Sequence, residues 1–170
     1  IGRTGNGSDY NDGIYVLLKE VLDNAIDEFI SGYGKSVNIK IENNLVTIRD
    51  YGRGIPLGKV IDCVSQINTG GKFNDDVFQF SVGMNGVGTK AVNALSTYFK
   101  VRSTRDGEFF EAIFKEGVLQ SQNKGTSTER NGTLVEFTPD DTIFKNYKFQ
   151  EEHIERRIRL SSYLNAGLSI

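Results

Sequence analysis

Glu20 and Asn24 lie four positions apart in a segment whose apolar residues recur every three or four positions. On a helix this spacing brings the carboxylate and the amide close together on one side. The amide oxygen is a neutral ligand suited to one corner of an octahedral Mg²⁺ shell, and a carboxylate one turn away can orient and deprotonate a water molecule. The same spacing is typical of the solvated polar side of a helix, so the pair alone leaves both interpretations open.

Asp50 ends an apolar strand and is followed by Tyr51-Gly52-Arg53-Gly54. A D-x-G-x-G segment can simply form a turn. An aspartate at the mouth of an apolar pocket can also accept a hydrogen bond from the exocyclic amine of adenine, while the glycines let the base approach the backbone. Guanine presents a carbonyl at that position, and a charged hydrogen bond contributes roughly 1.5 to 3 kcal/mol, so such a site would select adenine nucleotides.

A third segment, Gly83-Met84-Asn85-Gly86-Val87-Gly88, precedes a predicted helix. Free backbone N–H groups at the positive end of a helix dipole form a cradle for phosphates. The G-x-x-G-x-G spacing is weak evidence by itself. It is not a Walker loop, because G-x-x-x-x-G-K-[ST] is absent, and no strand leads directly into it as a Rossmann fingerprint requires.

The helices that must position these groups are predicted by hydrophobic periodicity. Residues 12–31 have the apolar stripe of a helix packed on a flat surface. Asp12 can cap its start, and Gly32 or Gly34 can cap its end. Further helices are predicted over residues 59–67, 87–95 and 150–164. Residues 68–86 are rich in glycine and polar side chains and too irregular for a tight turn, so we expect a mobile lid.

Alternating apolar and polar residues predict the strands. Residues 37–41 and 45–50 are expected to form a β-hairpin. Strands at 99–104, 108–115 and 118–122 are expected to form a meander, followed by a polar loop at 123–132 and a buried strand at 133–138. Helices gathered on one face of a mixed, largely antiparallel sheet make a two-layer α+β sandwich, here expected as a single domain over residues 1–170.

The composition fits one globular domain, with 38% hydrophobic residues and a net charge of -2. Binding to the phosphate backbone of DNA requires clustered Lys and Arg, so this chain is not expected to grip DNA itself. The single cysteine, Cys63, lies in an apolar run and is expected in the core, while His153 is expected to have no special role. No signal peptide or apolar run long enough to span a membrane is found, so a cytoplasmic location without a membrane partner is expected.

Together and in this order, the segments above and Gly132-Thr133 resemble the nucleotide site shared by the B subunits of bacterial type II topoisomerases, Hsp90, MutL and the sensor histidine kinases, the GHKL ATPases with the Bergerat fold. The segment 79–96, QFSVGMNGVGTKAVNALS, resembles the topoisomerase branch, and residues 13–20 favour the B subunit of topoisomerase IV over that of DNA gyrase. The resemblance implies that the domain binds ATP and Mg²⁺ and hydrolyses ATP to drive DNA strand passage by the complete bacterial enzyme.

The resemblance also implies roles for single residues. Glu20 is the expected general base, Asn24 the magnesium ligand, and Asp50 the acceptor for adenine. Thr133 corresponds to the threonine whose hydroxyl backs that aspartate, and Arg105 to the arginine at the rim of the pocket that contacts competitive inhibitors. The other expected nucleotide-binding residues are Arg53, Gly54, Ile55, Pro56, Lys72, Gly83, Met84, Asn85, Gly86, Val87, Gly88 and Thr89. The expected apolar lining of the adenine pocket includes Val21, Ala25, Ile48 and Val135.

Parts of the chain depart from the family pattern. Asn85, Gln79 and Phe78 stand where histidine, lysine and tyrosine are common, and Lys72 could be an ordinary exposed loop lysine instead of a phosphate ligand. The N-terminal arm and the transducer domain of the family are not found in the 170 residues. We therefore expect a fragment that is monomeric and weakly active. In the parent subunit, ATP binding is expected to cause dimerisation, DNA to be bound by other domains, and an A-type subunit to be the partner.

Three other interpretations compete with this one. An Hsp90-like or MutL-like ATPase is disfavoured by the Val92-Asn93-Ala94-Leu95-Ser96 and Gly70-Gly71-Lys72-Phe73 segments. A histidine kinase would need a phosphoacceptor domain upstream. A nucleotide-sensing module without significant hydrolysis is opposed by Glu20. The sequence does not separate a gyrase subunit from a topoisomerase IV subunit with certainty, and so it does not separate supercoiling from decatenation.

Overall fold

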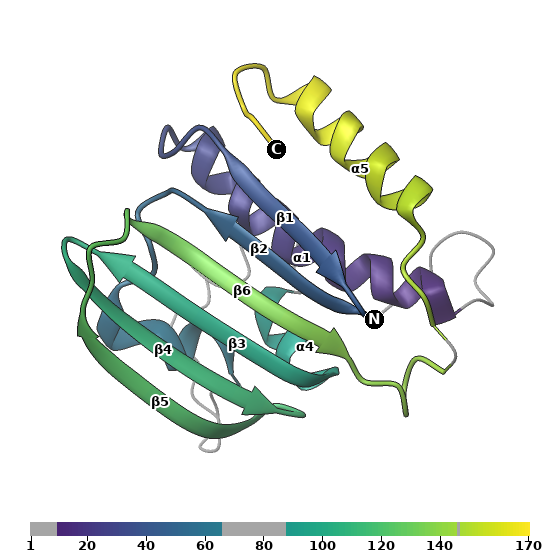
Figure 1. Cartoon of the computed structure of the whole chain (residues 1–170), viewed down its shortest axis with the longest axis horizontal. Coiled ribbons are helices and arrows are strands. Elements are labelled where there is room, and N and C mark those ends of the chain that lie inside the picture. The colour runs from purple at the N-terminus through teal and green to yellow at the C-terminus, as the bar shows by residue number, and fades with distance from the viewer. Residues whose placement is uncertain (1–9, 66–87, 146) are drawn as a thin grey trace.

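The computed structural model describes residues 10–65, 88–145 and 147–170 of the chain, with side chains from Gly13 onward (Figure 1). The expected lid at 68–86 lies outside these residues. The helices are α1 (Tyr10–Ile30), the 3-10 helix η1 (Leu57–Lys59), α2 (Val60–Val64), α4 (Gly88–Ala94) and α5 (Glu151–Leu164). The strands are β1 (Val37–Glu42), β2 (Leu45–Asp50), β3 (Ser96–Arg105), β4 (Glu108–Lys115), β5 (Val118–Thr126) and β6 (Gly132–Pro139).

The strands form one six-stranded sheet in the order β1-β2-β6-β3-β4-β5, and each of these neighbouring pairs is antiparallel. A single parallel bridge joins Ser36 to Ser169. The insertion of β6 between β2 and β3 matters for function, because it brings residues near position 133 beside the end of β2.

Tight turns connect three of the strand pairs. Asn43 and Asn44 have φ angles of 52° and 67°, so both central residues of the first hairpin are left-handed. Asp106-Gly107 and Glu116-Gly117 have the same pattern, with φ angles of 51° and 86°, and 51° and 84°. Such turns match the twist of antiparallel strands, which explains why these dipeptides end the predicted strands where they do.

Helices α1 and α4 lie behind one face of the sheet, which gives the expected two-layer arrangement (Figure 1). The hydrophobic core lies between these helices and the sheet. Leu17, Leu18 and Leu22 of α1 belong to it, together with buried side chains of the sheet such as Val46, Phe99 and Phe137. Cys63 is buried here too, as predicted, and burial raises the pKa of its thiol to about 11.

Helix α5 lies along the β1 side of the sheet in Figure 1 and has no fully buried residue. His153 stacks on the Tyr15 ring of α1 with centroids 5.2 Å apart, so it helps to dock this helix. No helix in the described ranges is long and apolar enough to cross a membrane.

Several sequence-based boundaries were wrong, including the start of the strand predicted at 99–104, which begins at Ser96. The first helix begins at Tyr10, so Asp12 lies inside it and is not its N-cap. The helix predicted at 59–67 begins as a 3-10 turn, and its α-helical part ends at Val64, because Ser65 has extended backbone angles. The loop predicted at 123–132 is strand up to Thr126: pairing with β4 holds a polar edge strand that alternation could not reveal.

Candidate functional site

Asp50 occupies a position where the alternation of buried and half-buried residues along β2 predicts an apolar side chain. Along β2, buried residues alternate with half-buried ones, and Val46, Ile48 and Asp50 are the buried set. The Asp50 carboxyl is therefore on the helix-covered face, where it is 7% exposed. Burial raises its pKa to about 6, and the hydrogen bonds from Gly52 and Thr133 oppose this shift.

Both of these hydrogen bonds go to one carboxylate oxygen. The backbone N–H groups of Gly52 and Thr133 donate to Asp50 Oδ1 at 2.9 and 3.2 Å. The contact with Thr133 is thus made by its backbone and not by the hydroxyl that the family resemblance suggested. Because both donors reach Oδ1, no donor from the described ranges occupies Oδ2, which can accept a hydrogen bond from a ligand.

Two glycines allow close backbone packing in this region, Gly132 against Asp50 and Gly54 against the end of β3. Gly132 has φ +146°, and a Cβ on it would collide with Asp50 O and with the Arg49 guanidinium. Gly54 has φ +79°, and its Cβ would lie 2.7 Å from Thr104 O and 2.9 Å from Arg105 Cγ. Side chains are excluded at both positions by sterics as well as by φ, which explains the glycines in the two motifs.

The apolar residues predicted to line the adenine pocket come together around Asp50. Ile48 of β2 pairs with Val135 of β6, and Val135 pairs with Val101 of β3. Val21 and Ala25 are buried on α1, which packs against β2 and β6. Ile55 is buried as well, and its carbonyl accepts a 2.7 Å hydrogen bond from the buried hydroxyl of Ser103, which ties the segment after Gly54 to β3.

Glu20 is buried and does not face solvent as a polar helix face would. It is 5% exposed, and the Gly88 backbone N–H at the start of α4 donates to its Oε2 at 3.3 Å. Burial raises the pKa of this carboxyl, while the Gly88 hydrogen bond lowers it to a lesser extent. A buried carboxylate with one oxygen engaged and a raised pKa is well suited to accept a proton.

Asn24 lies one turn further along α1, next to the same end of α4. Its Nδ2 donates to the hydroxyl oxygen of Thr89 at 2.6 Å. This bond uses the nitrogen end of the amide, and in the described part of the chain no donor reaches Oδ1. The free end is therefore the oxygen, the atom that a hard cation such as Mg²⁺ accepts as a ligand, so the residues present fit a magnesium site. Among the described residues, no group of three or more His, Cys, Asp or Glu is placed to hold a metal.

Arg53 and Arg105 lie at the edge of this region. Arg53 is exposed and is held by Glu28, with its Nη2 2.8 Å from Glu28 Oε1 and its guanidinium 4.5 Å from the Tyr33 ring centroid. The hydrogen bond to Glu28 is the main reason that the Arg53 pKa is raised. Arg105, at the end of β3, donates to Gly54 O at 3.4 Å. Glu28 was not predicted as a site residue, and Thr89 was predicted to bind nucleotide but not to contact Asn24, since only the fold brings these side chains to their partners.

Among the described residues, the sequence-predicted ones form two groups joined by α1: one around Asp50, which is expected to bind adenine, and one at Glu20, Asn24 and Gly88, which is expected to face the phosphates. Pro56 follows Ile55 and is half-buried. Six further predicted residues lie outside the described residues: Lys72, Gly83, Met84, Asn85, Gly86 and Val87, as do Phe78 and Gln79.

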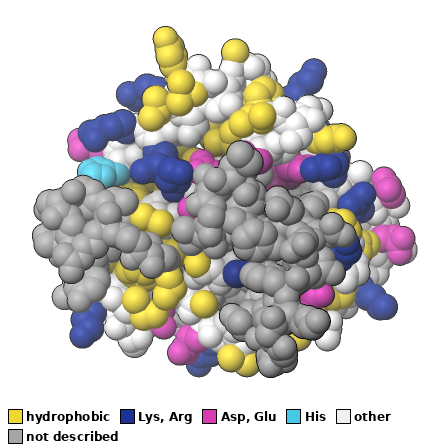
Figure 2. All heavy atoms as spheres, turned by 180° about the vertical axis from the view of Figure 1, so that it is seen from behind, with side chains coloured by type: hydrophobic (Ala, Val, Ile, Leu, Met, Phe, Trp, Pro, Cys, Tyr) yellow, Lys and Arg dark blue, Asp and Glu magenta, His cyan; other side chains and the backbone are white. Residues whose placement is uncertain are grey.

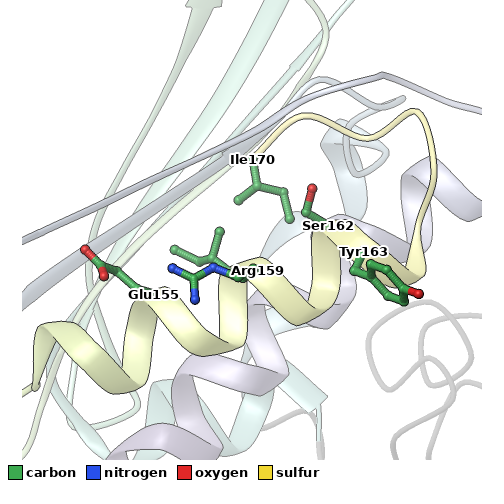
Figure 3. Close-up of a pocket in the computed structure, with 6 residues that line it drawn as sticks. Glu155, Arg159, Ser162, Tyr163 and Ile170 are labelled. Carbon is green, nitrogen blue, oxygen red and sulfur yellow. The ribbon is translucent and has the colours of Figure 1, made fainter.

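The remaining surface features lie elsewhere. In the view from the helix side, the visible Lys and Arg side chains are scattered among acidic and hydrophobic ones (Figure 2). An open pocket of about 520 Å³ lies between α5 and the C-terminal residues, and Figure 3 shows its lining: Glu155, Ile158, Arg159, Ser162, Tyr163 and Ile170. None of these residues belongs to the predicted nucleotide site.

Comparison with known proteins defines the class. Residues 9–143 match the family described as histidine kinase-, DNA gyrase B-, and HSP90-like ATPase. The chain belongs to this family of ATPases, as most of its length is matched. Within the family it is an ATPase domain of the type found in the B subunits of type II topoisomerases, as its similarity to three such proteins shows.

The chain is 61% identical over 170 residues to the B subunit of DNA topoisomerase 4 of Borreliella burgdorferi, and this alignment covers 100% of the chain and 28% of the relative. It is 36% identical over 178 residues to the B subunit of DNA gyrase of Mycobacterium tuberculosis, covering 100% of the chain and 26% of the relative. The 43K ATPase domain of Thermus thermophilus gyrase B, solved in complex with an aminocoumarin, aligns with a TM-score of 0.74 and 34% identity over 93% of this chain and 42% of that one. The chain therefore spans about a quarter of the length of these curated relatives.

Proposed function

We propose that this domain binds ATP with its adenine at Asp50 and its phosphates at the start of α4, and that it hydrolyses the nucleotide with Glu20 as general base. The observation that carries the proposal is the pair of N–H donors on Asp50 Oδ1, which leaves the second oxygen of a buried carboxylate for a ligand. The exocyclic amine of adenine donates to Oδ2, and Ile48, Val135 and Ala25 pack on the base. A carbonyl at the same place, as in guanine, would face an acceptor and be rejected.

At the phosphate end, Asn24 Oδ1 would hold Mg²⁺, and the bound ion would supply positive charge that stabilises the phosphates. Glu20 has Oε2 engaged by Gly88, so Oε1 is the oxygen that accepts a proton from the attacking water. The water oxygen bonds to the γ-phosphorus, the bond to the β-phosphate oxygen breaks, and ADP leaves. The raised pKa of Glu20 makes it a stronger base than an exposed glutamate.

In the complete protein, the same site would drive ATP-dependent DNA strand passage by a bacterial type II topoisomerase, with topoisomerase IV favoured by the 61% identity. Other parts of the subunit would bind DNA and an A-type partner subunit in the cytoplasm, and ATP would close two B subunits into a dimer. Residues 1–170 alone would behave as one weakly active, monomeric domain.

Competitive inhibitors are expected to use the adenine end of the site. The relative from Thermus thermophilus was solved with an aminocoumarin, and its fold matches this chain over 93% of the residues. Arg105, held to Gly54 at the edge of the site, is the residue we assign to the inhibitor rim.

Nucleotide selectivity tests the proposal directly. Calorimetry with ATP and GTP should give binding of ATP and an affinity for GTP lower by at least about tenfold, because a base with a carbonyl in place of the amine leaves Asp50 unpaired. Equal affinities would overturn the adenine assignment. Phosphate release by the same protein separates an ATPase from a nucleotide sensor: bound ATP that is never hydrolysed would favour the sensor.

A further inference from the structure

Thr89 holds the Asn24 amide by its nitrogen end. The two residues are 65 positions apart, and the Asn24 Nδ2 donates to Thr89 Oγ1 at 2.6 Å. Thr89 is 7% exposed, so water does not readily replace this contact. A threonine hydroxyl can donate or accept; in this structure it accepts, so the contact engages the donor end of the amide and not its oxygen.

Only one of the two orientations can hold a cation. With Nδ2 on Thr89, Oδ1 points away from that contact and is available as a ligand. With the amide turned around, the NH₂ group would face the cation and repel it. We propose that Thr89 is a positioning residue that holds the Asn24 amide with its oxygen toward the Mg²⁺ of a bound nucleotide. This inference rests on the proposed function and adds a support for the metal ligand.

Thr89 is well placed for this role because α4 is itself fixed at both ends. At its start, the neighbouring Gly88 donates its backbone N–H to Glu20. Near its other end, the buried Asn93 donates to the Val64 carbonyl at 2.9 Å, which ties α4 to α2. Two consecutive residues, Gly88 and Thr89, therefore hold the two functional groups of α1, one through the backbone and one through a side chain.

A direct contact between Thr89 and the nucleotide is the competing explanation, and magnesium dependence separates the two. A residue that touches the nucleotide contributes to binding with or without the metal. A residue that acts by orienting Asn24 contributes only when Mg²⁺ is present. The quantity to measure is therefore the ratio of the nucleotide affinity in Mg²⁺ to that in EDTA.

The experiment uses calorimetry of a non-hydrolysable ATP analogue with wild-type protein, Thr89→Val and Thr89→Ser. Valine keeps the shape of threonine and removes the hydroxyl, whereas serine keeps the hydroxyl. We expect Thr89→Val to reduce the Mg²⁺-to-EDTA affinity ratio by about tenfold, with the affinity in EDTA unchanged, and Thr89→Ser to keep the wild-type ratio. In an Asn24→Ala background, Thr89→Val should have no further effect on the ratio.

A wild-type ratio in folded Thr89→Val, or an equal loss of affinity in Mg²⁺ and in EDTA, would overturn the proposal. If Thr89→Val does not fold, NMR of the Asn24 side-chain NH₂ group in the wild type and in Thr89→Ser tests the proposal instead. Protection of this group from solvent exchange in both proteins, with and without Mg²⁺ and nucleotide, supports the proposal. Rapid exchange contradicts it. Failure of the wild type to bind the analogue at all would instead refute the proposed function.

Discussion

The backbone N–H of Thr133 donates to Asp50 Oδ1 at 3.2 Å across a separation of 83 residues. Pairing of β6 with β2 creates this contact, and the Gly52 N–H completes it from the local turn. The proposed adenine end of the site therefore depends on the assembled sheet. In the described part of the chain both donors reach Oδ1, and we propose that Oδ2 accepts from the ligand.

Asp50→Asn is expected to weaken ATP binding by at least about tenfold, equivalent to roughly 1.4 kcal/mol. The asparagine oxygen can still accept from Gly52 and Thr133, but its NH₂ group would then face the amine of adenine, so that two donors meet. Calorimetry of ATP binding measures the change. An affinity equal to that of the wild type would place adenine elsewhere.

The same substitution is expected to stabilise the fold at neutral pH. The pKa of Asp50 is raised from 3.8 to about 6, so the folded state holds the proton more tightly than the unfolded chain. Its cost to stability is absent at low pH, grows as the pH rises from about 4 to 6, and is complete above that. Between pH 4 and pH 7, Asp50→Asn should gain on the order of 2 to 3 kcal/mol relative to the wild type, because a pKa difference of one between the folded and unfolded states corresponds to about 1.4 kcal/mol.

Urea unfolding of both proteins at several pH values measures this difference. Taking the difference cancels the other carboxylates, which titrate alike in the two proteins. A difference that does not change with pH would mean that Asp50 ionises normally in the folded domain.

Glu20→Gln is expected to keep ATP binding and to lower turnover by about 10² to 10⁴-fold, the usual contribution of a general base. Glutamine can still accept the Gly88 N–H but cannot take a proton from water. Phosphate release together with calorimetry separates the two effects. If turnover were unchanged, another group would have to be the base; if binding were lost, Glu20 would be a binding residue.

Gly132→Ala is expected to cost about 1 to 3 kcal/mol of stability and to weaken ATP binding, because the new methyl group would collide with the Asp50 carbonyl and the Arg49 guanidinium. Gly58→Ala is the matched control: nothing lies within 4 Å of the position that its Cβ would take, so a change within about 0.5 kcal/mol is expected. Thermal unfolding compares the two variants. Equal stabilities would show that the backbone at Gly132 relaxes readily.

Much of the fold was predictable because it is locally encoded. The stripe of Leu18, Val21 and Leu22 and the alternation ending at Asp50 gave the elements that carry the site, and ATPase relatives confirm the fold class. The limits of β5 were not predictable, since its polar residues are held as strand by pairing with β4 and not by a hydrophobic pattern.

The site was predictable as a set of residue types but not as a set of contacts. The polar side of α1 could have been a solvated face, whereas Glu20 is buried and accepts a hydrogen bond from the start of α4. The supports provided by Thr89 to Asn24 and by Glu28 to Arg53 arise from residues far apart in the sequence, so periodicity carries no signal for them. The role of the Thr133 backbone also required the β2–β6 register.

A crystal structure of this chain with a non-hydrolysable ATP analogue and Mg²⁺ tests the central claim most directly. The account predicts the adenine amine within hydrogen-bonding distance of Asp50 Oδ2, Mg²⁺ bound to Asn24 Oδ1, and a water between Glu20 Oε1 and the γ-phosphate. Adenine bound away from Asp50, or Mg²⁺ held without Asn24, would contradict it.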